Sequence, residues 1–158
     1  MAQVCLVGKA DLNLRYELLS RETARDALVA YDLQEPFANA VAVDTVSLGA
    51  AVALLNDLDW YLVRFVAHVL VFDPSVSEDE WLSRGMARAI RDDEVDAEES
   101  GRFLKVFGVI EDGEGEGSGR RLVEPMLVTR TGESIPEYDL QEVDETLIVR
   151  VTESEFGA

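Results

Sequence analysis

The spacing of apolar and polar positions along the chain predicts strands near both ends. Short apolar or β-branched runs, most of them next to a turn signal, predict strands at residues 3–7, 40–46, 102–110, 121–129 and 145–152. The last three follow one another without an intervening helix. We therefore expect the C-terminal part of the chain to be built mainly from strands.

Helical spacing of apolar positions dominates between the first strands. It predicts a helix over residues 14–31, with Asp11 or Asn13 as its N-cap. Ser20 is a second capping residue inside this range, so we expect that the helix can break there. Ser47 follows a predicted strand and is the expected N-cap of a further, short helix.

The longest apolar run of the chain is WYLVRFVAHVLVF, at residues 60–72. Every second residue from Tyr61 to Val71 is apolar, which is the pattern of a strand with one buried face. The density of valine also favours a strand over a helix. Because the run is long for a single strand, we expect a bend or bulge within it. A buried helix is the alternative.

A helix is predicted after Pro74, which ends this run. The sequence SEDE at residues 77–80 has the pattern of a capping box, with Ser77 as the N-cap and Glu80 as the third helical residue. An apolar stripe with helical spacing follows at Trp81, Leu82, Gly85, Met86, Ala89 and Ile90. We therefore expect the helix to begin directly after Ser77.

The order of the predicted elements indicates one α+β domain over residues 1–158, with a mixed sheet. Strands and helices alternate in the N-terminal half, and the strands of the C-terminal half are expected to be antiparallel. The acidic, glycine-rich segment 111–120 predicts a flexible hairpin loop, and Pro125 predicts an edge or bulged strand after it. The segment YDLQE occurs at residues 31–35 and 138–142, which we interpret as chance or a shared loop-to-strand solution.

The net charge of the chain indicates the environment in which the protein is expected to work. The 158 residues include 32 acidic and 14 basic side chains, for a formal net charge of −18, and only Lys9 and Lys105 are lysines. Self-repulsion would destabilise such a chain at ordinary ionic strength, whereas in molar salt the Debye length falls to about 3 Å. An acid-rich, lysine-poor composition is typical of halophilic cytoplasmic proteins, so we expect that location. The same charge weighs against nucleic acid as a partner.

Several classes of protein are not expected. Charged residues interrupt the longest apolar region, and no signal peptide is evident, so we expect a soluble protein and no membrane partner. Cys5 is the single cysteine, which excludes an intramolecular disulfide, and its apolar neighbours predict a buried core residue. The glycine-rich loop lacks the spacing of a phosphate-binding loop. We find no catalytic triad pattern and expect no cofactor and no metal site.

Trp60, Arg64 and His68 form the first candidate site. A spacing of four places Arg64 and His68 on one side of either a strand or a helix. A cation, the single histidine and an aromatic ring together suit an anionic or planar ligand, or an interface. The alternative is structural, with Arg64 paired to a carboxylate and His68 packed on the sheet.

Three arginines with helical spacing form the second candidate, which we call the arginine stripe: Arg84, Arg88 and Arg91. Such a row can dock phosphate groups or an acidic partner. The alternative is an exposed helix with its own ion pairs, because Glu80–Arg84 and Arg88–Asp92 each have the spacing of an acid–base pair.

Five segments of the chain resemble a family of uncharacterised haloarchaeal proteins. They are QVCLVG, NLRYELLSRETARDAL, VSLGAAVALLNDLDWYLVRF, DPSVSEDEWLSR and IPEYDLQEVDET, and the likeness covers nearly the whole chain outside the glycine-rich loop. The resemblance implies a halophilic host and a single-domain size. It implies no activity and assigns no functional residue.

Three functional hypotheses follow from the sequence. The first is a small non-enzymatic interaction or regulatory module that binds a protein partner or self-associates, because no catalytic pattern is found and the arginine stripe offers a docking face. The second is a small-molecule or nucleotide-binding protein, or an enzyme, that uses Arg64 and His68. The third is an RNA-associated factor that uses the arginine stripe.

Overall fold

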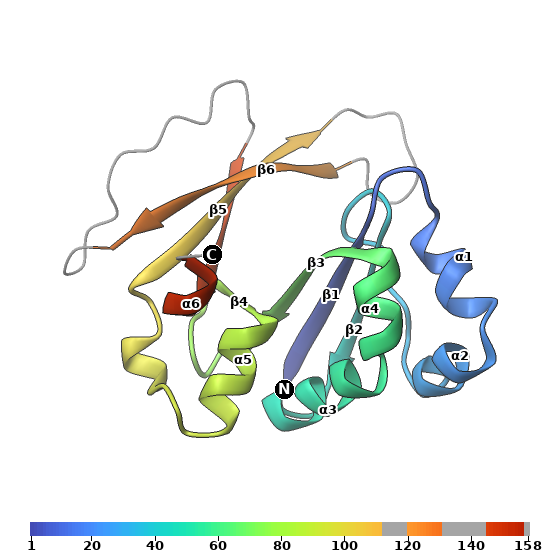
Figure 1. The fold of residues 1–158 in the computed structure, drawn as a ribbon, viewed down its shortest axis with the longest axis horizontal. Coiled ribbons are helices and arrows are strands. Elements are labelled where there is room, and N and C mark those ends of the chain that lie inside the picture. Colours follow the sequence, from blue (N-terminus) through green and yellow to red (C-terminus); the bar gives the residue numbers. More distant parts are fainter. Residues whose placement is uncertain (112–119, 131–144, 157–158) are drawn as a thin grey trace.

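Backbone pairing organises the chain around one seven-stranded sheet, in the order β2-β1-β3-β4-β7-β5-β6 (Figure 1). The computed structural model describes residues 1–111, 120–130 and 145–156. The strands are β1 (Ala2–Gly8), β2 (Ala40–Thr45), β3 (Val66–Phe72), β4 (Trp81–Ser83), β5 (Phe103–Glu111), β6 (Arg120–Thr129) and β7 (Glu145–Val151). The helices are α1 (Leu14–Leu19), α2 (Glu22–Leu28), α3 (Leu48–Asp57), α4 (Asp59–Phe65), α5 (Arg84–Arg91) and α6 (Glu153–Phe156). None of these helices is both long and apolar enough to cross a membrane.

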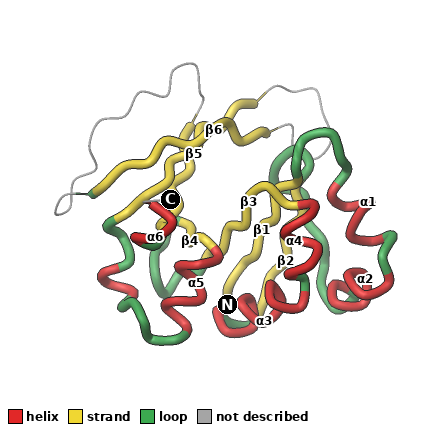
Figure 2. Tube along the Cα trace, viewed as in Figure 1, coloured by secondary structure: helices red, strands yellow, loops and turns green. Residues whose placement is uncertain are grey.

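Helices cover one face of the first four strands. Alternate residues of β1 to β4, including Leu6, Val43, Val71 and Leu82, point to this face and pack against buried side chains of α1 to α5. Figure 2 shows these five helices together on one side of the strands. The main apolar core therefore lies between the helices and the N-terminal half of the sheet.

The sheet curls so that its two halves meet on the other face. Cys5 on β1 and Leu70 on β3 share a second core with Phe107 on β5 and Val149 on β7. The His68 ring of β3 lies 4.8 Å from the Phe107 ring, although β4 and β7 separate their strands in the sheet. A flat sheet would keep these rings apart, so the bend occurs around the three-residue strand β4.

The predicted helix starts in the first half are confirmed. The Asn13 side chain accepts a hydrogen bond from the Tyr16 amide (3.0 Å), and the Ser47 hydroxyl accepts one from the Ala50 amide (3.1 Å). The expected break at Ser20 is also found, since α1 ends at Leu19 and α2 begins at Glu22. Strands β1 and β2 also lie where strands were predicted.

The prediction of a strand across residues 60–72 is wrong in its first half. Helix α4 occupies Asp59–Phe65, and only Val66–Phe72 form a strand. The helix buries Leu62, while β3 pairs with β1 along its length. Both the helical and the alternating pattern are present in this run, and the pairing with β1 determines where one gives way to the other.

The prediction of a helix directly after Ser77 is also wrong. The Ser77 hydroxyl does accept a hydrogen bond from the Glu80 amide (3.0 Å), as a capping box requires, but this bond closes a turn. Trp81–Ser83 then form β4, and Ser83 caps α5 by accepting from the Met86 amide (3.0 Å). Because β3 and β7 both pair with β4, these residues are held in the sheet rather than in a helix.

The three C-terminal strands are found where they were predicted, but their arrangement is mixed. β5 pairs antiparallel with β6 and β7, whereas β7 runs parallel to β4. The expectation of a wholly antiparallel half is therefore corrected by the crossover that brings β7 beside β4. The flexible loop predicted between β5 and β6, and the second YDLQE segment, lie outside the described residues.

Pro125 lies in an edge strand that also bulges, as its presence predicts. β6 is the last strand of the sheet order. Its register with β5 shifts between Val106, which faces Met126, and Gly108, which faces Val123. Two residues of β6, one of them Pro125, thus lie opposite the single residue Phe107.

Candidate functional site

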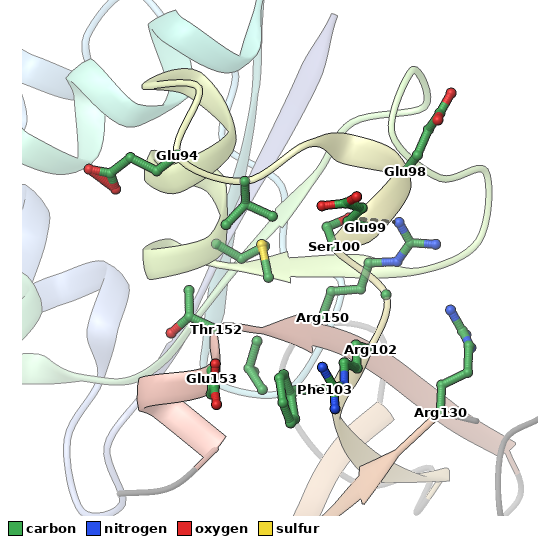
Figure 3. Close-up of a pocket in the computed structure, with 14 residues that line it drawn as sticks. Glu94, Glu98, Glu99, Ser100, Arg102, Phe103, Arg130, Arg150, Thr152 and Glu153 are labelled. Carbon is green, nitrogen blue, oxygen red and sulfur yellow. Dashed lines mark hydrogen bonds between the residues drawn. The ribbon is translucent and has the colours of Figure 1, made fainter. Parts of the chain in front are cut away.

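A hollow with a volume of about 810 Å³ lies where α5 leads into β5. We call it the Arg150 hollow. Its polar lining includes Arg130 and Arg150, which come from the ends of β6 and β7, and Ser100 from the α5–β5 connection (Figure 3). Its apolar lining is formed by Met86, Val95, Phe103 and Val151. Segments far apart in the sequence therefore meet here.

A single buried carboxylate holds both arginines in place. The Arg150 Nε donates to Glu80 Oε1 at 2.8 Å, and the Arg130 Nη2 donates to Glu80 Oε2. The side chain of Glu80 is only 9% exposed, and those of Arg150 and Arg130 are 14% and 17% exposed. Such shielding makes these contacts stronger than ion pairs on an open surface.

Ser100 and Gly101 lie next to the two guanidinium groups. The Ser100 hydroxyl accepts a hydrogen bond from Arg150 Nη1 (3.0 Å) and donates to the Ala97 carbonyl (2.6 Å). A Cβ atom on Gly101 would lie 2.5 Å from Arg130 Nη1. The glycine thus lets the backbone approach a guanidinium group that Glu80 holds from the other side.

Counting formal charges, the cluster is positive in a strongly acidic chain. Two guanidinium groups share one carboxylate, which leaves one positive charge at Arg130 and Arg150 without a matching negative charge inside the cluster. Arg102 and four glutamates also line the hollow: Glu94, Glu98, Glu99 and Glu153. In Figure 3 the side chains of Glu94 and Glu98 point away from Arg150, whereas Glu99 lies beside Ser100. The planar, bidentate guanidinium group is well suited to carboxylates and phosphates. The arrangement can therefore bind an anion.

The structure does not bring the first predicted site together. The Arg64 guanidinium lies over the Trp60 ring at 3.7 Å, and its Nη1 donates to the Trp60 carbonyl at 3.1 Å, on the exposed side of α4. His68 lies on β3 and packs edge-on against Phe107 in the second core. The expectation that Arg64 and His68 share one side is wrong, because the chain changes from helix to strand between them.

The arginine stripe is mostly engaged in contacts with its own chain. Arg84 Nη1 lies 2.7 Å from Asp59 Oδ1, so α5 is tied to α4, and Arg91 Nε lies 2.8 Å from Asp92 Oδ1. The hydrogen bond from Arg91 also holds the pKa of the Asp92 carboxyl below its usual value. Arg88 is exposed. The predicted pair Glu80–Arg84 is wrong, because Glu80 precedes the helix and faces Arg130 and Arg150.

Neither thiol nor metal chemistry finds support in the described residues. Cys5 is fully buried in the second core, and burial raises the pKa of its thiol to about 12, so it stays protonated. Over residues 1–111, 120–130 and 145–156, no three His, Cys, Asp or Glu side chains are grouped so that they can hold a metal ion.

Sequence reasoning missed the residues of the Arg150 hollow, although one signal was present. Arg150 stands between Val149 and Val151 in a strand that is otherwise largely apolar. A charged residue in such a position needs a buried partner. Glu80 offered no such signal, because the capping-box pattern already explained it.

One comparison with known proteins gives a match. A family described as a family of unknown function (DUF5804) matches residues 2–109. The matched range contains Glu80, Ser100 and Gly101, and it ends before Arg130 and Arg150. Searches of curated proteins and of solved structures gave no match.

Proposed function

The chain belongs to the family of unknown function DUF5804, and from its geometry we propose that it is a small non-enzymatic regulatory module that binds an organic anion in the Arg150 hollow. The observation that carries this proposal is the pair of shielded arginines, Arg130 and Arg150, on one buried carboxylate, Glu80. The carboxylate fixes both cations before a ligand arrives. Such preorganisation lowers the entropy lost on binding.

The size and lining of the hollow favour an organic ligand over a simple ion. Its volume of about 810 Å³ falls within the range of roughly 300–1,000 Å³ that is usual for small-molecule sites. Phe103 presents an aromatic ring and Met86 a flexible apolar side chain to the same space as Arg150. A ligand could therefore bind the arginines through an anionic group and pack an apolar or aromatic part against Phe103 and Met86.

A binding role fits these residues better than a catalytic one. The Ser100 hydroxyl donates its proton to the Ala97 carbonyl and contacts the Arg150 cation. A serine nucleophile instead needs a base that takes this proton. Arginine stays protonated and so is a poor proton acceptor.

We expect phenyl phosphate to bind to the purified chain more tightly than inorganic phosphate or phenol. Only phenyl phosphate has both an anionic group for the arginines and an aromatic ring for the apolar lining. Binding is measured by isothermal titration calorimetry at a KCl concentration that keeps the chain folded. Arg150→Met removes one cation and leaves a neutral Glu80–Arg130 pair, so we expect at least about tenfold weaker binding. Arg88→Met is the matched control on an exposed arginine and is expected to leave the affinity unchanged.

Equal losses of affinity for phenyl phosphate in Arg150→Met and Arg88→Met would contradict the proposal. Equal affinities of the natural chain for phenyl phosphate and phenol would also contradict it. Circular dichroism first establishes that Arg150→Met is folded. Arg130→Met replaces it if it is not, since that variant leaves the Glu80–Arg150 pair intact.

A second candidate function is protein interaction through α4. Trp60 is 48% exposed and Val63 is 65% exposed, and Arg64 lies against the tryptophan ring. Exposed aromatic and arginine side chains are common at protein interfaces. Self-association that is abolished by Trp60→Ser, together with no binding of phenyl phosphate, would favour this function. The RNA alternative has less support, because Arg84 and Arg91 are paired with carboxylates.

The host environment that we propose is a haloarchaeal cytoplasm. It is supported by the formal net charge of −18 and by the use of arginine rather than lysine. Charge repulsion of this size is tolerated where salt screens it. The Arg150 hollow, being shielded, keeps more of its electrostatic attraction under such conditions than an exposed site would.

Stability is therefore expected to rise with KCl. The urea midpoint should increase from about 0.1 M to about 1 M KCl, as the Debye length falls from about 10 Å to about 3 Å. Repeating the series near the isoelectric point of about 4.2, where the net charge is small, gives the control, and the dependence on KCl should weaken there. A midpoint that is insensitive to KCl at neutral pH would contradict the proposed environment.

A further inference from the structure

A second, smaller cavity lies beside β4, next to the second core in which the two halves of the sheet meet. It has a volume of about 190 Å³ and is lined by residues of β3, β5 and β7. Ser83 and Arg84, where β4 leads into α5, and Glu155 of α6 complete the lining. Its polar lining includes His68, Lys105, Ser83 and Glu155. We call it the Lys105 cavity. Only Val151 lines both this cavity and the Arg150 hollow.

Lys105 is a partly buried cation that the described residues leave without an ion pair. The chain has 32 acidic residues, and Lys9 is the only other lysine. Placing an ammonium group at a shielded position without a counterion is costly. The position is favourable once an anion enters the cavity.

His68 faces the same space as a neutral ring. Burial, and then the charge of Lys105, lower the pKa of its imidazole below the usual value. At neutral pH the ring therefore adds no charge, but it offers one donor and one acceptor. Arg84 also lines the cavity, and its guanidinium is already paired with Asp59 at 2.7 Å. Lys105 is thus the cation that a ligand would meet.

The Glu155 carboxylate also lines the cavity. Glu155 Oε1 accepts hydrogen bonds from the Ser83 hydroxyl (2.7 Å), the Thr152 amide (2.9 Å) and the Thr152 hydroxyl (2.9 Å). A Cβ on Gly85 would lie 2.8 Å from this oxygen, so the absence of a side chain there makes room for it. Because the Glu155 carboxylate is negatively charged, it repels a dianion such as phosphate more strongly than a monoanion in the same cavity.

We propose that the Lys105 cavity binds a short-chain monocarboxylate, with the carboxylate on Lys105 and the alkyl chain on the apolar wall. That wall is formed by Leu70, Phe107, Val149 and Val151. The volume of about 190 Å³ is below the range usual for drug-sized ligands, which limits the alkyl chain to a few carbons. This site is independent of the one proposed in the Arg150 hollow.

The single histidine of the chain supplies the readout. Ring resonances of His68 are followed by NMR on the full chain while acetate, butyrate or inorganic phosphate is added at constant chloride and pH. We expect saturable shifts with both carboxylates, up to about tenfold tighter binding for butyrate than for acetate, and no saturable shift with phosphate. Bound butyrate should also raise the pKa of His68 toward its usual value, because it neutralises Lys105.

Lysine variants test whether Lys105 is the anchor. Lys105→Gln is expected to abolish the shifts, and Lys105→Arg to retain them. Lys9→Gln is the matched control, because Lys9 is exposed, donates to the Val63 carbonyl (3.0 Å) and is not among the residues that line the cavity. Shifts that persist in Lys105→Gln would overturn the proposal. If that variant does not fold, equal shifts from butyrate and phosphate on the natural chain would overturn it.

Discussion

Replacing Glu80 by glutamine is expected to lower the free energy of unfolding by about 3–5 kcal/mol. The substitution keeps the size of the side chain and removes its charge. Arg130 and Arg150 are then left with two shielded positive charges and no carboxylate between them. The loss is large because the energy of desolvating these cations remains while the attraction that offset it is gone.

Urea unfolding at constant KCl measures this change. Glu78→Gln is the matched control: it is the same substitution two residues earlier, at an exposed position. We expect it to change the unfolding free energy by no more than about 0.5 kcal/mol. A loss below about 1 kcal/mol in Glu80→Gln would show that the cluster is solvated and weak.

The second large effect is expected at the strand that joins the two halves of the sheet. Leu82 is fully buried at the centre of β4, opposite Val71 of β3 on one side and Arg150 of β7 on the other. Truncation of a buried leucine to alanine costs about 2–5 kcal/mol, and the upper part of this range applies where the surroundings cannot collapse into the space. Two strands hold this backbone in place, so we expect a value in the upper part for Leu82→Ala.

Leu127→Ala serves as the comparison for this variant. Leu127 is a strand residue of the same type on β6, but it is 45% exposed. Its truncation leaves no enclosed space and is expected to cost no more than about 0.5 kcal/mol by the same urea titration. Equal losses in the two variants would mean that β4 contributes no more than an edge strand does.

Local signals in the sequence were sufficient for much of the fold. Asn13 and Ser47 are capping residues whose hydrogen bonds lie within three residues, so their effect does not depend on distant parts of the chain. The same holds for the break at Ser20. The C-terminal strands were also predictable, because alternation and β-branched residues act over each strand separately.

Elements whose structure depends on distant partners were not predictable in the same way. The run at residues 60–72 fits both periodicities, and pairing of β3 with β1 selects the strand only from Val66 onward. Trp81–Ser83 are too short to form a strand alone, and they do so because β3 and β7 flank them. Tertiary contacts override local preference in both cases.

The Arg150 hollow shows the same limit for a site. Glu80, Ser100, Arg130 and Arg150 stand far apart in the sequence, and the crossover that places β7 beside β4 is what brings Arg150 to Glu80. By contrast, Trp60 and Arg64 do contact each other, because a spacing of four within one helix is a local relation. His68 belongs to another element and is separated from them.

The bulge at Pro125 has a consequence for aggregation. β6 is the last strand of the sheet that the described residues form, and an unpaired sheet edge is a template on which another molecule can add a strand. A proline has no amide hydrogen to donate, and the shifted register around it bends the strand. The edge is therefore a poor template for cross-β growth.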